Sequence, residues 1–360
     1  MKRNKLNKQQ KIASYDPGMI YAEHGLFGLP FTNEESDVVL IPMPWEVTTS
    51  YRDGTAQGPE FMTKSSYQVD LYDEDIKNAW HAGIAMESIS KYWLKKNKEL
   101  RPLAEKCIAN IEKGGTPQDK KVIKFYEKIN AASHELNTWM KAESARLLNA
   151  GKLVGVVGGE HSVPYGLMQA LGEKYNKYSI LHIDAHADYR QAYEGFAHSH
   201  ASIQYNAGLL PCVENQVLLS IRDYSEEEAG YIAKSRGKII AFSDRILKRN
   251  SYTGTTWQKQ CEQIIKPLGE NVYISFDIDA LDPSLCPHTG TPVPGGLEFE
   301  QVFYLLESLL KAGKKIIGFD LCEVAPGAGS NGEWDAIVGA RALYRLSLLL
   351  AKSHGKKVGQ

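Results

Sequence analysis

The sequence predicts an α/β fold with three layers, in which a central, mostly parallel sheet lies between two layers of helices. From residue 153 onward, apolar runs of strand length alternate with longer stretches in which apolar residues recur at helical spacing. This order is typical of parallel strands joined by crossover helices. The strands are apolar almost throughout, as expected of strands covered on both faces. Polar motifs follow several of them directly, which indicates a binding site at the carboxyl edge of the sheet.

The elements can be assigned in order along the chain. The first buried strand is expected at residues 37–44, and a short helix is expected to begin near Pro59, because proline suits the first turn of a helix. A longer helix is predicted over 127–150, with Gly151 as its stop. Further strands are predicted at 153–157, 179–184, 216–221, 238–242, 271–276 and 315–321, and further helices at 163–175, 226–235, 256–267, 298–312 and 333–351.

The chain divides into two parts. Residues 1–36 are polar and rich in turn-forming residues, so we expect an N-terminal extension that lies over the surface. Residues 37–360 are expected to form a single domain. Within it, residues 77–125 contain Lys-rich and Glu-rich pieces, which predict solvated helices and loops inserted into the main fold.

Composition argues against several classes of partner. The 42 basic and 43 acidic residues give a net charge of -1, so no overall field attracts nucleic acid or an anionic membrane. The five cysteines are scattered and form no C-x-x-C pair, which argues against disulfides and a structural zinc site. No apolar run has the length needed to span a bilayer. We therefore expect a cytoplasmic protein that acts on a small molecule.

The most informative stretch is residues 179–188, in which an apolar run ends in Asp184, His186 and Asp188. Side chains of an extended segment alternate between its two faces, so these three are expected to point to one side. Taken alone, a polar loop with a hydrogen-bonded histidine would explain the pattern equally well. The other segments that follow strands decide between these interpretations.

Three such segments carry further polar residues. Residues 157–162 form a glycine turn that brings His161 to the end of a strand. Asp277 and Asp279 lie two residues apart at the end of an apolar strand, where a buried charge must be paired or bind a metal. Glu323 follows an almost wholly apolar strand.

Six of these residues are candidate metal ligands: His161, Asp184, His186, Asp188, Asp277 and Asp279. Four carboxylates and two imidazoles favour a pair of divalent ions, with Mn2+ expected and Ni2+ as the alternative, over a sulfur-rich zinc site. The four negative charges nearly neutralise two dications. This arrangement is typical of two-metal hydrolases, in which a shared water loses its proton near neutral pH.

Three motifs, in this order, resemble the signatures of the ureohydrolase family, which comprises arginases, agmatinases, formiminoglutamases and guanidino-acid hydrolases. They are Gly-Gly-Glu-His-Ser at 158–162, Asp-Ala-His-Ala-Asp at 184–188 and Ser-Phe-Asp-Ile-Asp-Ala-Leu-Asp-Pro at 275–283. The similarity covers about residues 38–348. It implies an arginase-like fold, hydrolysis of a guanidino compound to urea and an amine, and a homo-oligomer, either a trimer or a hexamer.

The resemblance also implies roles for single residues. The six ligands would hold two Mn2+ ions, with aspartates bridging them, and Glu323 matches the glutamate that holds the guanidinium group. His200 aligns with the family's proton-shuttling histidine, and His198 is the alternative. Asp188 is expected to hold the proton of the attacking water. Glu160 stands where many members have aspartate, and both can accept a hydrogen bond beside the metal ligands.

Agmatine, which would give putrescine and urea, is the expected substrate. Residues 189–196 lack the polar loop with which arginases read the amino-acid head group, and formiminoglutamases usually lack the histidine at the position of His200, so both activities are less favoured. Free guanidine and guanidino acids such as guanidinobutyrate stay as alternatives. Arg190 would suit a carboxylate of the substrate and Glu194 an ammonium group. Trp45 is expected at the rim of the pocket.

Three rival functions fit part of the pattern. A non-catalytic relative could keep metals for stability, but it would be expected to lose His200 or Glu323 first. A deacetylase with a related fold uses one metal, which the second aspartate pair argues against. The segment Gly327–Gly332 matches the G-x-G-x-x-G of nicotinamide-binding proteins, yet the acidic residue expected about twenty positions later is missing. A glycine turn explains this segment better.

Overall fold

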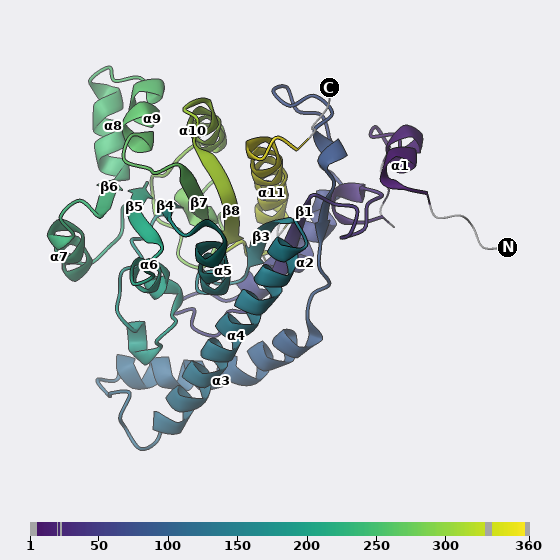
Figure 1. The fold of residues 1–360 in the computed structure, drawn as a ribbon. Helices are drawn as coiled ribbons and strands as arrows, with labels where there is room; N and C mark the ends of the chain where they lie inside the picture. The colour runs from purple at the N-terminus through teal and green to yellow at the C-terminus, as the bar shows by residue number, and fades with distance from the viewer. Residues whose placement is uncertain (1–5, 20, 22–23, 328–332, 357–360) are drawn as a thin grey trace.

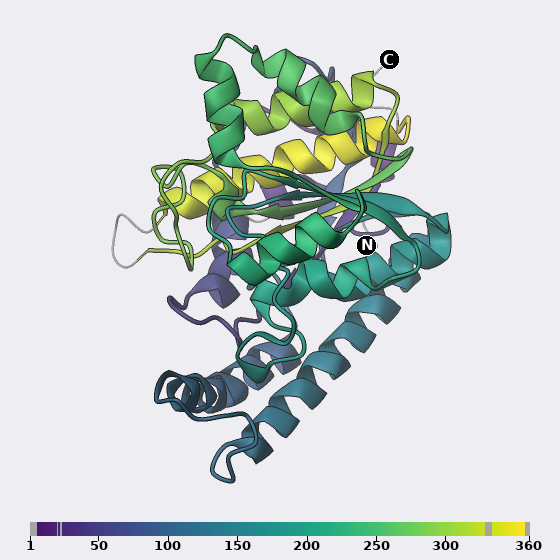
Figure 2. The same cartoon turned by 90° about the vertical axis from the view of Figure 1, so that its left-hand side faces the viewer.

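The computed structural model describes residues 6–19, 21, 24–327 and 333–356. Its centre is one eight-stranded sheet with the strand order β2-β1-β3-β8-β7-β4-β5-β6, and all neighbouring strands in it are parallel. Helices cover both faces of this sheet (Figures 1 and 2). The predicted three-layer α/β/α fold is therefore confirmed.

The strands agree with the sequence pattern except at one edge. Seven predicted strands are present, and the eighth, β2, is a three-residue strand inside the 77–125 region that has no distinct pattern of its own. The strands are β1 (Val38–Met43), β2 (Ile84–Met86), β3 (Leu153–Gly158), β4 (Tyr178–Ile183), β5 (Val213–Leu219), β6 (Ile239–Phe242), β7 (Asn271–Asp277) and β8 (Lys315–Cys322).

Eleven α-helices are found in the described residues, and the predicted ones are among them. Three short helices, α1, α6 and α8, were not predicted, because fewer than ten residues show little periodicity. The helices are α1 (Lys8–Ser14), α2 (Gly58–Ser66), α3 (Lys91–Glu112), α4 (Ile123–Asn149), α5 (Tyr165–Tyr175), α6 (Ile203–Gly208), α7 (Glu226–Lys234), α8 (Asp244–Tyr252), α9 (Trp257–Ile265), α10 (Phe299–Lys311) and α11 (Trp334–Ser353). None of the helices in the described ranges has the length and apolar character required to cross a membrane.

Two hydrophobic cores lie on opposite faces of the sheet. In β1, Val38 and Leu40 belong to the core packed by α2, α9, α10 and α11, whereas Val39 and Ile41 belong to the core packed by α3, α4, α5 and α6. This alternation follows from the two-residue period of a strand. Each fully buried aliphatic side chain stabilises the fold by roughly 1.5–3 kcal/mol. The sheet is thus a rigid platform for the loops at its carboxyl edge.

Helix α3 and the first half of α4 extend away from the sheet (Figure 2). The two helices lie side by side, and the ring of Trp93 in α3 meets that of Trp139 in the second half of α4 edge-on, with their centroids 5.8 Å apart. The region 77–125 therefore supplies both an edge strand and a helix that packs against α4. Helix α3 also contacts a loop beside the functional site, as described below.

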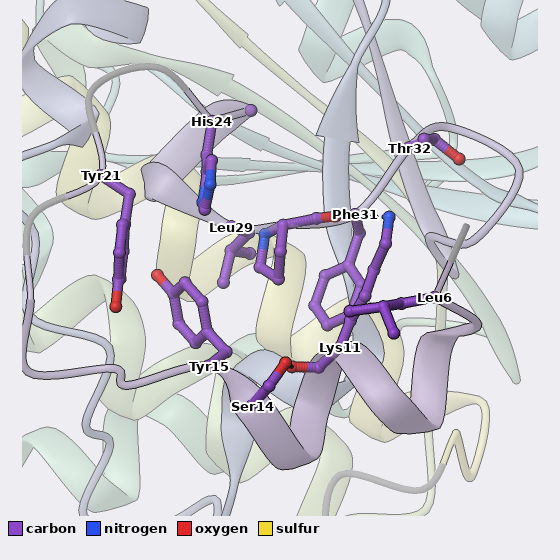
Figure 3. Close-up of a pocket in the computed structure, with 11 residues that line it drawn as sticks. Leu6, Lys11, Ser14, Tyr15, Tyr21, His24, Leu29, Phe31 and Thr32 are labelled. Atoms are coloured by element: carbon purple, nitrogen blue, oxygen red, sulfur yellow. Dashed lines mark hydrogen bonds between the residues drawn. The ribbon is translucent and has the colours of Figure 1, made fainter. Parts of the chain in front are cut away.

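The N-terminal segment lies only partly on the surface, in contrast to the expectation for residues 1–36. Helix α1 buries no residue and is held by two lysines: Lys8 donates to Asp37 at 3.0 Å, and Lys11 donates to Glu35 at 2.6 Å. The segment after it, however, places Leu29 and Phe31 in the core, because apolar residues are spaced among its turns. Between α1 and the segment of Tyr21 and residues 24–32 lies a cavity of about 560 Å³ (Figure 3), and none of its lining residues belongs to the site described next.

Candidate metal centre and active site

Four strands that lie next to one another in the middle of the sheet carry the predicted site. β3, β8, β7 and β4 are consecutive neighbours, although they are far apart in the sequence. His161 follows β3, Asp184 follows β4, Asp277 ends β7 and Glu323 follows β8. Because the strands are parallel, their carboxyl ends meet at one edge, which is where ligands bind in open α/β sheets.

Three aspartates surround one ring nitrogen of His161. Its Nδ1 lies 3.1 Å from Asp184 Oδ2, 3.3 Å from Asp277 Oδ2 and 3.6 Å from Asp188 Oδ2. All four side chains are buried, with at most 7% of any of them exposed. Three carboxylates therefore approach the same ring nitrogen.

A second cluster adjoins the first and shares Asp184 with it. His186 Nδ1 lies 3.0 Å from Asp279 Oδ2 and 3.5 Å from Asp184 Oδ1. Asp184 thus directs one oxygen toward each histidine, which is the arrangement required of a carboxylate that bridges two cations. The structure brings together all six residues that the sequence singles out as ligands.

Turns, and not the extended segment expected from the sequence, bring these side chains to one side. β4 ends at Ile183, and Asp188 has a left-handed backbone with a φ of 55°. The leading aspartate of each motif accepts a hydrogen bond from the backbone two residues on: Asp184 Oδ1 from His186 N at 2.6 Å, and Asp277 Oδ1 from Asp279 N at 2.9 Å. Tight turns, which aspartate favours, therefore gather the side chains.

His161 is oriented by a carboxylate that the sequence reasoning missed. Its Nε2 lies 3.1 Å from Asp320 Oδ1 and 2.9 Å from Ser275 Oγ. Tyr273 donates its hydroxyl to Asp320 Oδ2 at 2.7 Å, and Phe276 N donates to Oδ1 at 3.2 Å. Asp320 is therefore held by two donors and can accept a hydrogen bond from Nε2 of His161. This orients the ring so that Nδ1 faces the three aspartates. The sequence does carry a sign of this role, because Asp320 is a charged residue inside the almost wholly apolar strand β8 and must be paired there.

His182 is a second buried residue that sequence reasoning missed. Its Nε2 lies 3.2 Å from Asp184 Oδ2, and its Nδ1 lies 3.0 Å from Gln204 Nε2. Burial lowers the pKa of His182 to about 4, so the ring is neutral at neutral pH. Its position in β4, two residues before Asp184, placed it on the same side of the strand.

The donor set fits divalent cations. Burial, followed by repulsion from Asp184, raises the pKa of Asp188 well above its usual range, and burial with repulsion from Asp279 does the same to the pKa of Asp277. Buried carboxylates this close together are unfavourable unless positive charge lies between them. Oxygen and imidazole donors suit first-row divalent ions.

Glu323 lies at the side of the clusters in a fixed position. Its backbone is left-handed, with a φ of 63°, and such strain concentrates at functional sites. Its Oε1 accepts a hydrogen bond from His161 N at 2.8 Å. A Cβ atom at Gly290 would lie 3.4 Å from Oε2, so glycine there keeps space beside this oxygen. Burial and the nearby Asp277 raise the pKa of Glu323 well above its usual range.

His200 lies over the site among hydroxyl groups. Its backbone N donates to Thr48 Oγ1 at 3.1 Å, and its Nε2 is 3.5 Å from Ser50 Oγ. Burial and the neighbouring His186 lower the pKa of His200 to about 3, so the ring is neutral at neutral pH. His198, the alternative, packs against the ring of Tyr165 with centroids 5.3 Å apart.

Besides Glu323 and His200, three residues are expected from sequence to contact the substrate, and the structure corrects one of them. The side chain of Trp45 is 1% exposed and packs edge-on against Trp93 at 6.0 Å, so it lies in the core and not at a pocket rim. The reason is that the chain turns after β1 and directs the ring toward α3.

The other two proposed contacts lie on the loop that carries His200. Arg190 Nε is 3.6 Å from Glu228 Oε2, and its guanidinium is 4.7 Å from the ring centre of Tyr193. Burial and repulsion from Glu112 raise the pKa of Glu194 to about 7. The segment Gly327–Gly332 falls mostly on residues 328–332, which lie outside the described residues.

We expect the metal-free His200→Asn variant to lose less stability than the metal-free unsubstituted protein when the pH is lowered. The pKa of His200 drops from 6.5 to about 3 on folding, so its contribution to stability is lost as the pH falls below 6.5. The asparagine variant has no such group. Thermal unfolding at pH 8 and pH 5 would test this, and an equal Tm difference at both pH values would contradict it.

The paired clusters, at the carboxyl edge of a parallel sheet, could hold two metal ions. Residues 36–349 match the model of the arginase family. The N(1)-aminopropylagmatine ureohydrolase of Thermus thermophilus is 31% identical over 310 residues, which cover 86% of this chain and 88% of that protein. The agmatinase of Bacillus anthracis is 29% identical, covering 81% and 85%. The proclavaminate amidino hydrolase structure from Streptomyces clavuligerus has a TM-score of 0.69 at 22% identity, covering 94% and 100%, and shows the shared fold.

The chain therefore belongs to the arginase family. The resemblance seen in the three sequence motifs is confirmed, and so is the class of enzyme, a hydrolase that acts on amidines.

Proposed function

We propose that this protein hydrolyses agmatine to putrescine and urea. The observation that carries the proposal is the position of Glu323, a buried carboxylate beside two clusters of metal ligands that share Asp184. A carboxylate can hold a planar guanidinium through paired, charge-assisted hydrogen bonds. The relatives named as agmatinase and N(1)-aminopropylagmatine ureohydrolase support a guanidino substrate.

Two Mn2+ ions are proposed for the site, and Ni2+ is the alternative. His161, Asp184, Asp188 and Asp277 would hold one of them. His186, Asp279 and Asp184 would hold the other. When bound, such a pair supplies a water that is deprotonated near neutral pH and a Lewis acid for the reacting carbon.

The remaining chemistry falls to three side chains. Glu323 binds the guanidinium and directs its central carbon toward the two clusters. Asp188 accepts and holds the proton of the attacking water. His200 relays that proton to the leaving amine, taking it up at one ring nitrogen while giving one from the other, and positioned proton transfer of this kind contributes about 10²–10⁴-fold to the rate. A neutral imidazole suits this step, because one nitrogen can donate while the other accepts.

The surroundings favour an amine-bearing substrate over a guanidino acid. Arg190, the residue suited to a carboxylate, already pairs with Glu228, while Glu194 has a buried oxygen with no hydrogen-bond partner among the described residues. N(1)-aminopropylagmatine is the second candidate, because a relative named for it covers most of the chain. We also propose a cytoplasmic homo-oligomer, either a trimer or a hexamer.

The test is product release from a panel of substrates after the protein has been loaded with Mn2+ or Ni2+ in separate samples. The panel is agmatine, N(1)-aminopropylagmatine, guanidine, guanidinobutyrate, arginine and formiminoglutamate. We expect the highest kcat/KM for agmatine with Mn2+. A higher value for another guanidino compound would reassign the substrate. A metal-loaded protein that released no product from any of them would be a non-catalytic relative.

A further inference from the structure

Helix α3 contacts the loop after β1 from one face. Trp93, Asn97 and Arg101 are spaced by four residues, which places them on one stripe of a helix. Trp93 packs against Trp45, Asn97 Oδ1 accepts a hydrogen bond from Glu46 N at 2.8 Å, and Arg101 Nη1 donates to Val47 O at 3.3 Å and to Thr49 O. Three successive turns of α3 therefore contact residues 45–49, the first through the ring of Trp45 and the other two through backbone atoms.

Thr48 lies between the two carbonyl groups that Arg101 binds. Its backbone N donates to Glu160 Oε2 at 2.7 Å, and its hydroxyl donates to Glu160 Oε1 at 2.8 Å. The same hydroxyl accepts a hydrogen bond from His200 N at 3.1 Å. Thr48 thus links the turn that carries His161 to the backbone of His200.

We propose that Arg101 is a positioning residue for His200, acting through the carbonyl groups on either side of Thr48. This inference rests on the proposed role of His200 in proton transfer. An arginine suits the task because its guanidinium donates in a rigid, forked geometry. Its side chain is only 15% exposed, and buried carbonyl groups that lose their donor are unfavourable.

The consequence is a defect in the proton-transfer step and not in binding. Without the guanidinium, residues 47–49 relax, and the hydroxyl of Thr48 and the ring of His200 move with them. A misplacement of about 1 Å at a reacting group can lower the rate by about 10²-fold. Neither the metal ligands nor Glu323 contacts Arg101, so metal content and KM should not change.

A double-mutant cycle tests the proposal, because residues that act through one another are not additive. The variants are Arg101→Met, His200→Ala and the two combined, with kcat, KM, metal content and Tm measured for each. We expect Arg101→Met alone to lower kcat by about 10-fold or more. In a protein that already carries His200→Ala, we expect Arg101→Met to cause no further decrease in kcat. Lys95→Met is the matched control, since Lys95 lies on the same helix, is 78% exposed and pairs only with Glu99 among the described residues.

Equal effects of Arg101→Met with and without His200 would overturn the proposal, as would a loss of metal or a rise in KM. If Arg101→Met does not fold, Arg101→Lys takes its place in the cycle. A lysine ammonium can donate to one carbonyl group but lacks the forked guanidinium that reaches both. We then expect a smaller decrease in kcat, again absent beside His200→Ala. If His200→Ala leaves kcat unchanged, the proposed function of His200 fails. If His200→Ala lowers kcat and Arg101→Met does not, only the present inference fails.

Discussion

Asp277→Asn is expected to abolish hydrolysis and, in the metal-free protein, to raise the stability of the fold. Asp277 directs Oδ2 at His161 Nδ1 from 3.3 Å and lies among other buried carboxylates. Removing its charge takes away a ligand, and we expect kcat/KM to fall by about 10³-fold or more, because both the nucleophile and the Lewis acid depend on the metal pair. The same change relieves repulsion when metals are absent.

The sign of the pH dependence follows from the pKa of Asp277. Burial, Asp279 and Asp184 raise this pKa well above 3.8 in the folded chain, so the carboxyl's contribution to stability is present at low pH and is lost as the pH rises. The stability of the metal-free Asp277→Asn variant, relative to that of the metal-free unsubstituted protein, should therefore increase as the pH rises above 3.8.

The measurements are urea release, metal content, and Tm with and without Mn2+. Binding of a ligand to the folded state raises Tm, and we expect Mn2+ to stabilise the unsubstituted protein far more than the variant. Asp282→Asn is the control, because Asp282 belongs to the same motif but accepts its hydrogen bond from Ser284 N. An Asp277→Asn enzyme that kept two metals and its activity would contradict the assigned ligands.

Glu323→Gln is expected to lower kcat/KM for agmatine by about 10²-fold or more while the metals stay bound, because breaking a buried ion pair costs about 3–5 kcal/mol. Glutamine keeps an oxygen for the hydrogen bond from His161 N but cannot neutralise a guanidinium. Free guanidine and agmatine should lose rate to a similar extent, since both present the same group to Glu323.

The readouts for this variant are product release from agmatine and guanidine, metal content, and calorimetric binding of guanidinium. Glu173→Gln is the control, since Glu173 is 61% exposed and pairs with Lys141 on the surface. Unchanged guanidinium binding by the Glu323→Gln enzyme would exclude this glutamate as the site that holds the substrate.

Much of this architecture could be predicted because strand and ligand motifs are local. The apolar runs fix the strands, and the aspartates stand directly after them, so parallel pairing brings Asp184, Asp277 and Glu323 to one edge. Asp320 was missed because its donors, Tyr273 and Phe276, belong to β7 and not to its own strand, β8. A contact between strands is invisible in the periodicity of either one.

Side-chain direction in irregular segments could not be predicted either. Trp45 follows β1, where no periodicity says whether the ring faces solvent or α3. The contact of Arg101 with residues 47–49 spans more than fifty positions and depends on how the 77–125 region packs. The left-handed backbone at Asp188, which turns its carboxylate toward His161, is likewise a property of the folded loop.

The order of the sheet also determines when the enzyme can first work during its synthesis. β8 is the last strand in the described part of the chain and lies between β3 and β7, so it must insert between strands that were made earlier. Pairings between distant segments form slowly, because a long loop must close before they contribute. If Glu323 holds the substrate as proposed, a nascent chain that ends before this residue would contain the proposed cation ligands but not this carboxylate, so we expect activity only after about nine-tenths of the 360 residues have been translated.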